Sequence, residues 1–239
     1  MPVDFGATWA PIVAGLPEEQ VNVLREDPRS AVTVYVGTDQ GGVYMTRNGG
    51  TSWLSLCANL PPAAVHDIAI QSRERELVIG THGRGAFKID LAPIQDFSDA
   101  IAAEAVHLFP VRPALLPQTR DYGGDWALET RQPAALIYSL KSAGRVSLRI
   151  FDDKGKAVLE REEQGRAGLN VAVWDLVVGG GYASPAVLGA GAKLAGNGDY
   201  RIELQSGAAR AGGVLTIRKP SQPKIGWESG RNRDRRGAR

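Results

Sequence analysis

The fold is decided by one stretch, Thr46-Arg47-Asn48-Gly49-Gly50-Thr51-Ser52-Trp53. It predicts a tight turn between two β-strands, because the runs on either side of it, residues 42–45 and 53–56, have strand composition. The side chain of Asn48 can accept hydrogen bonds from nearby backbone N–H groups, and Gly49 and Gly50 can take the positive φ angles of a tight hairpin. Trp53 then gives the returning strand a large apolar anchor.

Parts of the chain repeat at a fixed distance. A shift of 44 positions brings Trp53 onto Trp9, and a shift of 43 positions brings residues 34–38 onto residues 77–81. A period of about 40–45 residues with several short strands per repeat is typical of a β-propeller blade. Near the start of the chain, the repeated turn retains Asp4, Gly6, Thr8 and Trp9.

The repeated turn resembles the Asp-box, Ser/Thr-x-Asp-x-Gly-x-Thr-Trp, of the BNR-repeat propellers. This family includes sialidases, xyloglucan-cleaving glycoside hydrolases and sortilin-like receptors. The resemblance implies a structural turn on the outer rim of a blade, so it marks a fold and not an activity. The full box here is Thr46, Asn48, Gly50, Ser52 and Trp53, with Asn in place of the usual Asp; the first copy is Asp4, Gly6, Thr8 and Trp9, with Pro2 at the Ser/Thr position.

We expect residues 1–92 to be the C-terminal blades, about two, of a BNR-repeat β-propeller. Residues 1–17 would hold the last strand of one blade, and residues 18–61 one complete blade. A further blade begins at residue 65 but has only three predicted strands, so its outer strand would come from the N-terminus of the full protein. Met1 falls inside the first box, and we therefore expect the chain to be the C-terminal part of a longer exported protein, periplasmic or extracellular.

The rest of the chain predicts a second β domain. Residues 93–131 are expected to form a connector with a short helix at 99–105, and residues 132–220 an immunoglobulin-like antiparallel sandwich of six strands. The connector resembles the segment that leaves the propeller in glycosyl hydrolase-like bacterial BNR proteins. The sandwich resembles the immunoglobulin-like domain of the flagellar hook-capping protein, and sorting modules at the ends of secreted bacterial proteins. The residues that carry this resemblance are Ile137-Tyr138-Ser139-Leu140, Asp153-Lys154-Gly155-Lys156, Gly168-Leu169-Asn170 with Trp174-Asp175, and Gly198-Asp199-Tyr200. Residues 221–239 are expected to be a disordered basic tail. The fold class is therefore all-β.

Composition limits the possible partners. The 239 residues have a net charge of +2, and eight Lys or Arg lie in residues 218–239. Because Trp227 is the single aromatic residue in that tail, we expect a solubilising end and do not favour nucleic acid as a partner. No apolar run is long enough for a membrane span, and the lone Cys57 permits no internal disulfide. We expect no metal or cofactor, because the three histidines have no metal-ligand spacing; they are His66, His82 and His107.

The candidate ligand-binding residues lie in two equivalent loops. Asp39 follows the second strand of the complete blade, and His82 and Arg84 follow the second strand of the next blade. They could face an anionic or sugar ligand, or they could be structural, with glycines making the hairpin and Arg84 pairing with a neighbouring carboxylate. Catalysis of glycoside hydrolysis would need two carboxylates about 5–10 Å apart. No sequence pattern marks such a pair among Asp39, Asp67 and Asp90.

Two functions follow from this sequence. The leading hypothesis is a non-catalytic binding or scaffold role for the C-terminal portion of an exported BNR-propeller protein. Its partners would be the missing N-terminal blades and a protein, peptide or glycan ligand. The alternative is a fragment of a glycoside hydrolase, sialidase-like or xyloglucanase-like, with its catalytic residues on the missing blades.

Overall fold

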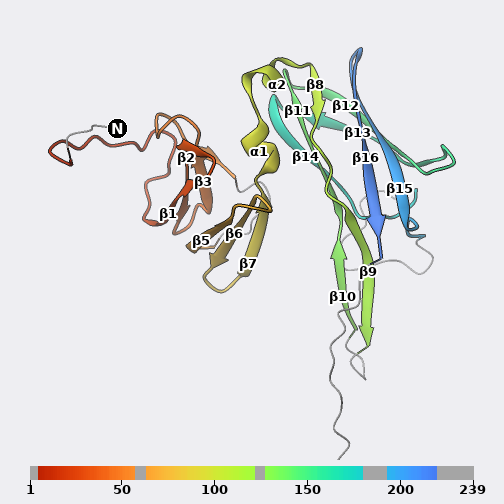
Figure 1. Ribbon diagram of the computed structural model, residues 1–239, viewed down its shortest axis with the longest axis horizontal. Helices are drawn as coiled ribbons and strands as arrows, with labels where there is room; N and C mark the ends of the chain where they lie inside the picture. The colour runs from red at the N-terminus through yellow and green to blue at the C-terminus, as the bar shows by residue number, and fades with distance from the viewer. Residues whose placement is uncertain (1–4, 57–62, 122–126, 180–192, 220–239) are drawn as a thin grey trace, which may run out of the picture. The chain divides into compact units, whose positions relative to one another are not determined.

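The computed structural model describes residues 5–56, 63–121, 127–179 and 193–219, and it gives no side-chain environments for residues 117–132. The described chain is almost entirely β-structure (Figure 1), as the sequence predicts. It divides into two compact units, Met1–Asp99 and Ala100–Arg239. Three features of the sequence analysis lie outside the described residues: Asp4, Cys57 and the tail of residues 221–239.

The first unit begins with the complete four-stranded blade that the sequence predicts. Its strands are β1 (Val21–Asp27), β2 (Ser30–Thr38), β3 (Val43–Thr46) and β4 (Leu54–Ser55). They pair in the order β1-β2-β3-β4, each antiparallel to the next. The middle strands are the most buried, with Val34, Val36 and Trp53 in one apolar cluster. This meander of antiparallel strands is the arrangement of a propeller blade.

A second sheet of the same order follows, but it has three strands. They are β5 (Val65–Gln71), β6 (Glu76–Thr81) and β7 (Gly85–Asp90), in the order β5-β6-β7. Among the described residues, no strand pairs with the other side of β7. The prediction of a blade with three strands of its own is therefore confirmed.

The two sheets of the first unit pack closely because of a glycine. A Cβ atom added to Gly37 on β2 would lie 2.5 Å from Val65 Cγ1 and 2.8 Å from Val23 Cγ1, so no larger residue fits there. Arg25 on β1 also forms an ion pair with Asp67 on β5, at 2.9 Å. The two inner strands thus lie side by side, as in neighbouring blades.

Helices are short. The sequence predicts one helix at 99–105, and the structure has α1 (Ala92–Asp96) and α2 (Asp99–Ala103). α1 was missed because Ala92-Pro93 looks like a break, although a proline is tolerated in the first turn of a helix, where its missing N–H has no intrahelical partner. No helix of the described chain is long and apolar enough to cross a membrane.

The second unit is a β-sandwich with one apolar core. Its strands are β8 (Val106–Leu108), β9 (Ala114–Asp121), β10 (Ala127–Gln132), β11 (Ala134–Leu140), β12 (Gly144–Phe151), β13 (Ala157–Gly165), β14 (Gly168–Trp174), β15 (Gly198–Ser206) and β16 (Ala209–Arg218). One sheet has the order β10-β9-β16-β15-β12-β13 and the other β14-β11-β8. Side chains from both sheets share the core, for example Leu136, Trp174, Ile150 and Ile202. β11 to β16 are the six strands that the sequence predicts.

Three strands lie in the segment expected to be a connector. β8 pairs with β11, and β9 pairs in parallel with β16, so the sandwich is not wholly antiparallel. These strands were missed because Pro110 and Pro113 look like breaks. Both prolines fall between β8 and β9, where a missing backbone donor costs the sheet nothing.

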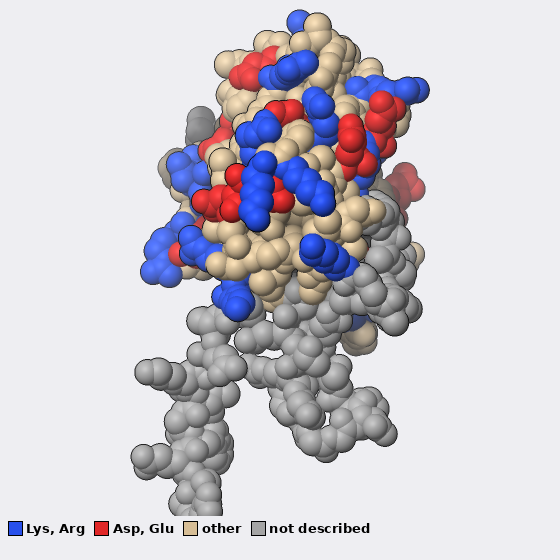
Figure 2. All heavy atoms as spheres, turned by 90° about the vertical axis from the view of Figure 1, so that its right-hand side faces the viewer, with Lys and Arg blue, Asp and Glu red and all other residues tan. Residues whose placement is uncertain are grey.

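The outer face of the six-stranded sheet carries charges of both signs. Figure 2 shows Lys and Arg interspersed with Asp and Glu over one side of the molecule. On this sheet Arg149 of β12 lies opposite Glu203 of β15 and pairs with it at 3.4 Å, and Arg145 pairs with Glu162 at 3.2 Å. Opposite charges on neighbouring strands therefore offset each other locally.

Candidate functional site

The box turn between β3 and β4 is closed by its own side chains. Asn48 Oδ1 accepts hydrogen bonds from the Thr46 hydroxyl at 2.8 Å and from the Ser52 backbone N–H at 3.0 Å. The Thr46 hydroxyl oxygen accepts from the Gly50 N–H at 2.9 Å, and Asn48 Nδ2 donates to Ser52 Oγ at 2.9 Å. Gly49 and Gly50 both have positive φ, at 65° and 89°. The polar groups of the box serve the turn itself.

Trp53 anchors the turn to the segment that precedes β1. Its indole N–H donates to the Ile12 carbonyl at 2.6 Å, its backbone N–H donates to the Ala14 carbonyl at 3.0 Å, and its side chain is 5% exposed. A Cβ on Gly15 would lie 2.8 Å from the Trp53 carbonyl oxygen. The box tryptophan therefore holds residues 12–15 against the outer side of the sheet.

The first copy of the box has the turn but not the burial. Gly6 has φ 86° and Phe5 has φ 52°, close to the pair at Gly50 and Gly49. Trp9 is 89% exposed, whereas Trp53 is 5% exposed. The sheet to which a first box would belong is not part of the described chain.

The sequence-predicted ligand residues Asp39, His82 and Arg84 lie in the β2–β3 and β6–β7 loops. Both loops join the second strand of a sheet to the third, so they lie at equivalent ends of the two sheets. Asp39 accepts a long hydrogen bond from Asn22 Nδ2 at 3.4 Å, and the His82 ring lies 5.5 Å from the His66 ring. Among the described residues, no hydrogen bond or ion pair joins Asp39 to His82 or Arg84. The loops are thus placed alike, but the three side chains do not form one bonded cluster.

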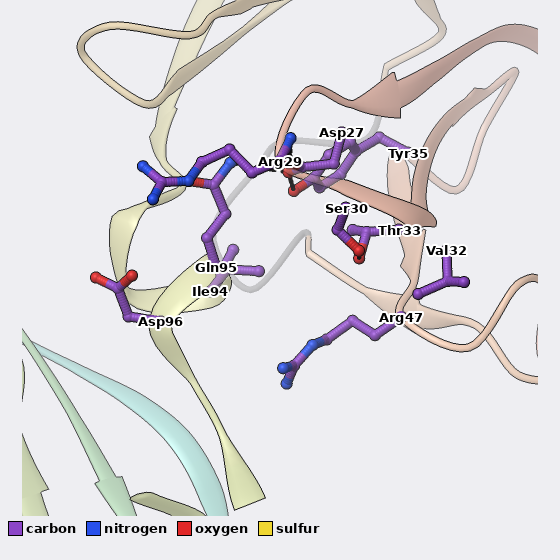
Figure 3. Close-up of a pocket in the computed structure, with 10 residues that line it drawn as sticks. All are labelled: Asp27, Arg29, Ser30, Val32, Thr33, Tyr35, Arg47, Ile94, Gln95 and Asp96. Carbon is purple, nitrogen blue, oxygen red and sulfur yellow. Dashed lines mark hydrogen bonds between the residues drawn. The ribbon is translucent and has the colours of Figure 1, made fainter.

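A pocket lies at the opposite end of the first sheet, at the β1–β2 turn. It has a volume of about 410 Å³, and Figure 3 shows its walls rising from that turn, from the start of the box and from α1. No local sequence pattern indicates this pocket. Its lining is Asp27, Arg29, Ser30, Val32, Thr33, Tyr35, Arg47, Ile94, Gln95 and Asp96.

The buried carboxylate of Asp27 is the centre of the pocket wall. It is 4% exposed, and its Oδ2 accepts from the Tyr35 hydroxyl at 2.6 Å and from Gln95 Nε2 at 2.8 Å. Its Oδ1 accepts from the backbone N–H of Arg29 at 2.8 Å. Burial, together with the bond to this carboxylate, raises the pKa of Tyr35 well above its usual value. Tyr35 therefore stays a neutral hydrogen-bond donor at physiological pH.

The second carboxylate of the pocket, Asp96, is held by Arg75. The guanidinium donates to both carboxylate oxygens, at 2.9 and 2.6 Å, and its Nε donates to Gln95 Oε1 at 2.6 Å. The bond to Asp96 raises the pKa of Arg75 above its usual value. Gln95 and Arg75 together thus connect the two carboxylate groups, and the network docks α1 onto the β1–β2 turn. The hydrogen bonds of these residues therefore serve mainly to stabilise the fold.

The remaining side chains of the pocket that could contact a ligand are polar. Ser30 and Thr33 carry hydroxyl groups that bond to each other at 2.8 Å, and the Arg47 guanidinium lies 5.5 Å from the Phe97 ring centre. Hydroxyl and guanidinium groups suit a polar or anionic ligand group. Within the described part of the chain, no group of three or more His, Cys, Asp or Glu residues could hold a metal ion.

Comparisons with known proteins assign no family. No protein-family model matches the sequence, and no curated protein matches it. One solved structure that is similar to this chain is the crystal structure of dimeric latent PorU from Porphyromonas gingivalis. The match has 17% sequence identity and a TM-score of 0.31, and it covers 88% of this chain and 17% of that chain. At that level of similarity we draw no conclusion about fold or function from it.

Proposed function

We propose that this chain has a non-catalytic binding and scaffold role, as part of an exported propeller protein. The observation that carries the proposal is the side of β7 with which no strand of the described residues pairs. The β1–β4 sheet has an outer strand on β3, whereas the β5–β7 sheet stops at the equivalent strand. A strand edge presents a row of backbone donors and acceptors, and an extended partner can bind by adding a strand to it.

The carboxylates of the first unit support a role without catalysis. A glycoside hydrolase needs an acid and a second carboxylate facing each other across a pocket, about 5–10 Å apart. Asp27 and Asp96 are the two carboxylates of the pocket, and both oxygens of each already accept hydrogen bonds from the protein. They are used to dock α1, and not to face a substrate.

Two measurements test the proposal. The purified chain should release no aryl alcohol above background from a panel of aryl glycosides that includes sialosides. Turnover that disappears in Asp39→Asn or Asp67→Asn would move the assignment to an enzyme. In hydrogen exchange, the amides of residues 85–89 should exchange faster than those of residues 43–46, and an added strand-forming partner should slow them.

A further inference from the structure

We propose that the partner of β7 is a second copy of this chain, which donates its residues 5–12. This inference rests on the proposed function, because it names the partner of the same edge. It predicts that copies associate head to tail, each completing the three-stranded sheet of the next.

The intact sheet shows what is missing on β7. β3 continues through the box turn into β4, which pairs back on it at Tyr44↔Ser55 and Met45↔Leu54. The run Gly42-Val43-Tyr44 corresponds to Gly85-Ala86-Phe87, so β7 is the equivalent of β3. After β7 the chain turns into α1 instead of a box and a fourth strand. In the part of the chain that the structure describes, the β5–β7 sheet therefore lacks a box and an outer strand.

The start of the chain carries those two parts. Under the shift of 44 positions, Trp9 takes the place of Trp53, and Ala10-Pro11-Ile12 takes the place of Leu54-Ser55-Leu56. In the intact sheet the Leu56 N–H donates to the Val43 carbonyl at 2.9 Å. The corresponding bond on β7 would run from the Ile12 N–H to the Ala86 carbonyl.

Pro11 is compatible with this register. Successive N–H groups of a strand point to opposite sides, and the Leu56 N–H points at β3. The N–H of Ser55 therefore points away from β3. A proline at the equivalent position of a donated outer strand would remove no bond of the ladder.

The donor segment already has the backbone conformation of the box turn. Gly6 and Phe5 have φ angles of 86° and 52°, against 89° and 65° at Gly50 and Gly49. Positive φ is uncommon for a residue with the bulk of phenylalanine, so the turn is held in the box conformation at a cost. Several of its apolar side chains face solvent, and Trp9 is almost fully exposed; the exposed set is Phe5, Trp9 and Ile12.

The geometry of the first unit favours a second copy over the chain's own β7. Residues 12 and 14 are fixed to Trp53 through their carbonyl oxygens. In Figure 1 the segment before β1 extends from the β1–β4 sheet on the side away from β5–β7. Donor and acceptor thus lie on opposite sides of the first unit. Such an interface is heterologous, and it builds rings if the rotation closes and open chains if it does not.

The experiment measures the mass of the full chain in solution by sedimentation velocity over a range of concentrations. We expect multiples of the 25.5 kDa chain that grow with concentration. Trp9→Ala should lose the association by weakening the donor segment, and Ala86→Pro by removing the backbone N–H that β7 presents on the side away from β6. Mixing the two variants should give a heterodimer, because the first retains β7 and the second retains the donor segment. Val13→Ala is the matched control and should associate like the unchanged chain.

A second measurement covers the case in which Ala86→Pro does not fold. A synthetic peptide of residues 2–13 is added to the full chain, and exchange at residues 85–89 is followed. We expect the peptide to slow this exchange and to compete with association, and a Trp9→Ala peptide to do neither. If the chain stays a monomer and the peptide has no effect, the inference is wrong. If a different extended strand slows exchange at residues 85–89, the proposed function still holds although the inference is wrong. If no strand slows it, both the proposed function and the inference are wrong.

Discussion

The β1–β4 sheet and the β5–β7 sheet have the same strand order, but within the described residues only the first has a box turn and an outer strand. The two tryptophans of the boxes show the consequence. Trp53 is buried because β2, β3 and residues 12–16 surround it, whereas Trp9 has the same turn before it and remains exposed. The comparison teaches that the box specifies a turn by itself, while burial of its tryptophan depends on a sheet and an incoming chain.

The largest expected effect is at the buried tryptophan. Trp53→Ala should destabilise the first unit by about 3–5 kcal/mol, because it leaves a cavity in the core. It also removes the bond to the Ile12 carbonyl. Hydrogen exchange of residues 21–46 in native protein measures the change. Trp9→Ala is the matched control, and an equal loss of stability in that variant at low concentration would contradict the comparison.

The next effect concerns the network that docks α1. Asp27→Ala should cost about 2–3 kcal/mol, because the Tyr35 hydroxyl and Gln95 amide lose their common acceptor in a buried place. The loss of stability is measured by chemical denaturation, with hydrogen exchange of the amides of residues 92–96 as the signal. A double-mutant cycle with Tyr35→Phe should give a coupling energy, since the two groups share one bond. Additive effects would mean that the bond contributes nothing.

The raised pKa of Tyr35 predicts a loss of stability in alkali. A tyrosine whose folded pKa lies above its unfolded pKa supports the folded state fully below about pH 10, and loses that support as pH rises further. The expected slope is about 1.4 kcal/mol per pH unit above that point. Tyr35→Phe should flatten the pH dependence of exchange in residues 21–46. An unchanged slope would show that other groups cause it.

A smaller effect is expected at the box turn. Asn48→Ala should cost about 1 kcal/mol, since it removes the acceptor of the Ser52 N–H and Thr46 hydroxyl in a partly exposed turn. Asn48→Asp is the informative partner variant, because its carboxylate keeps both acceptor bonds. Thermal unfolding should rank the unchanged chain and Asn48→Asp together, above Asn48→Ala.

The smallest effect is expected for the ion pair between the inner strands. Arg25→Ala should change stability by less than about 1 kcal/mol, because its ion pair with Asp67 is largely exposed to solvent. Gly37→Ala tests the same junction by packing and should be more damaging, since its Cβ would meet Val65 and Val23. If the two variants had equal effects, charge and not close packing would hold the sheets together.

Much of the fold could be predicted because its signals are local. The eight residues from Thr46 to Trp53 contain almost all the hydrogen-bond partners of the box turn, and alternation of apolar residues marks strands such as β12. The candidate loops at Asp39, His82 and Arg84 were placed correctly at equivalent positions of two sheets. Whether they bind a ligand stays a prediction.

The sequence by itself determined the turns, the strand periods and the repeat that makes the first unit a pair of blade-type sheets. Only the tertiary structure decided which distant groups meet. Asp27 bonds to Gln95 across 68 residues, and the Trp53 indole bonds to Ile12 across 41. β9 pairs in parallel with the end of β16, at Ala114↔Ile217 and Leu115↔Arg218. A turn is specified by residues that are neighbours in the chain, whereas long-range contacts arise when packing brings together groups that no local pattern pairs in advance.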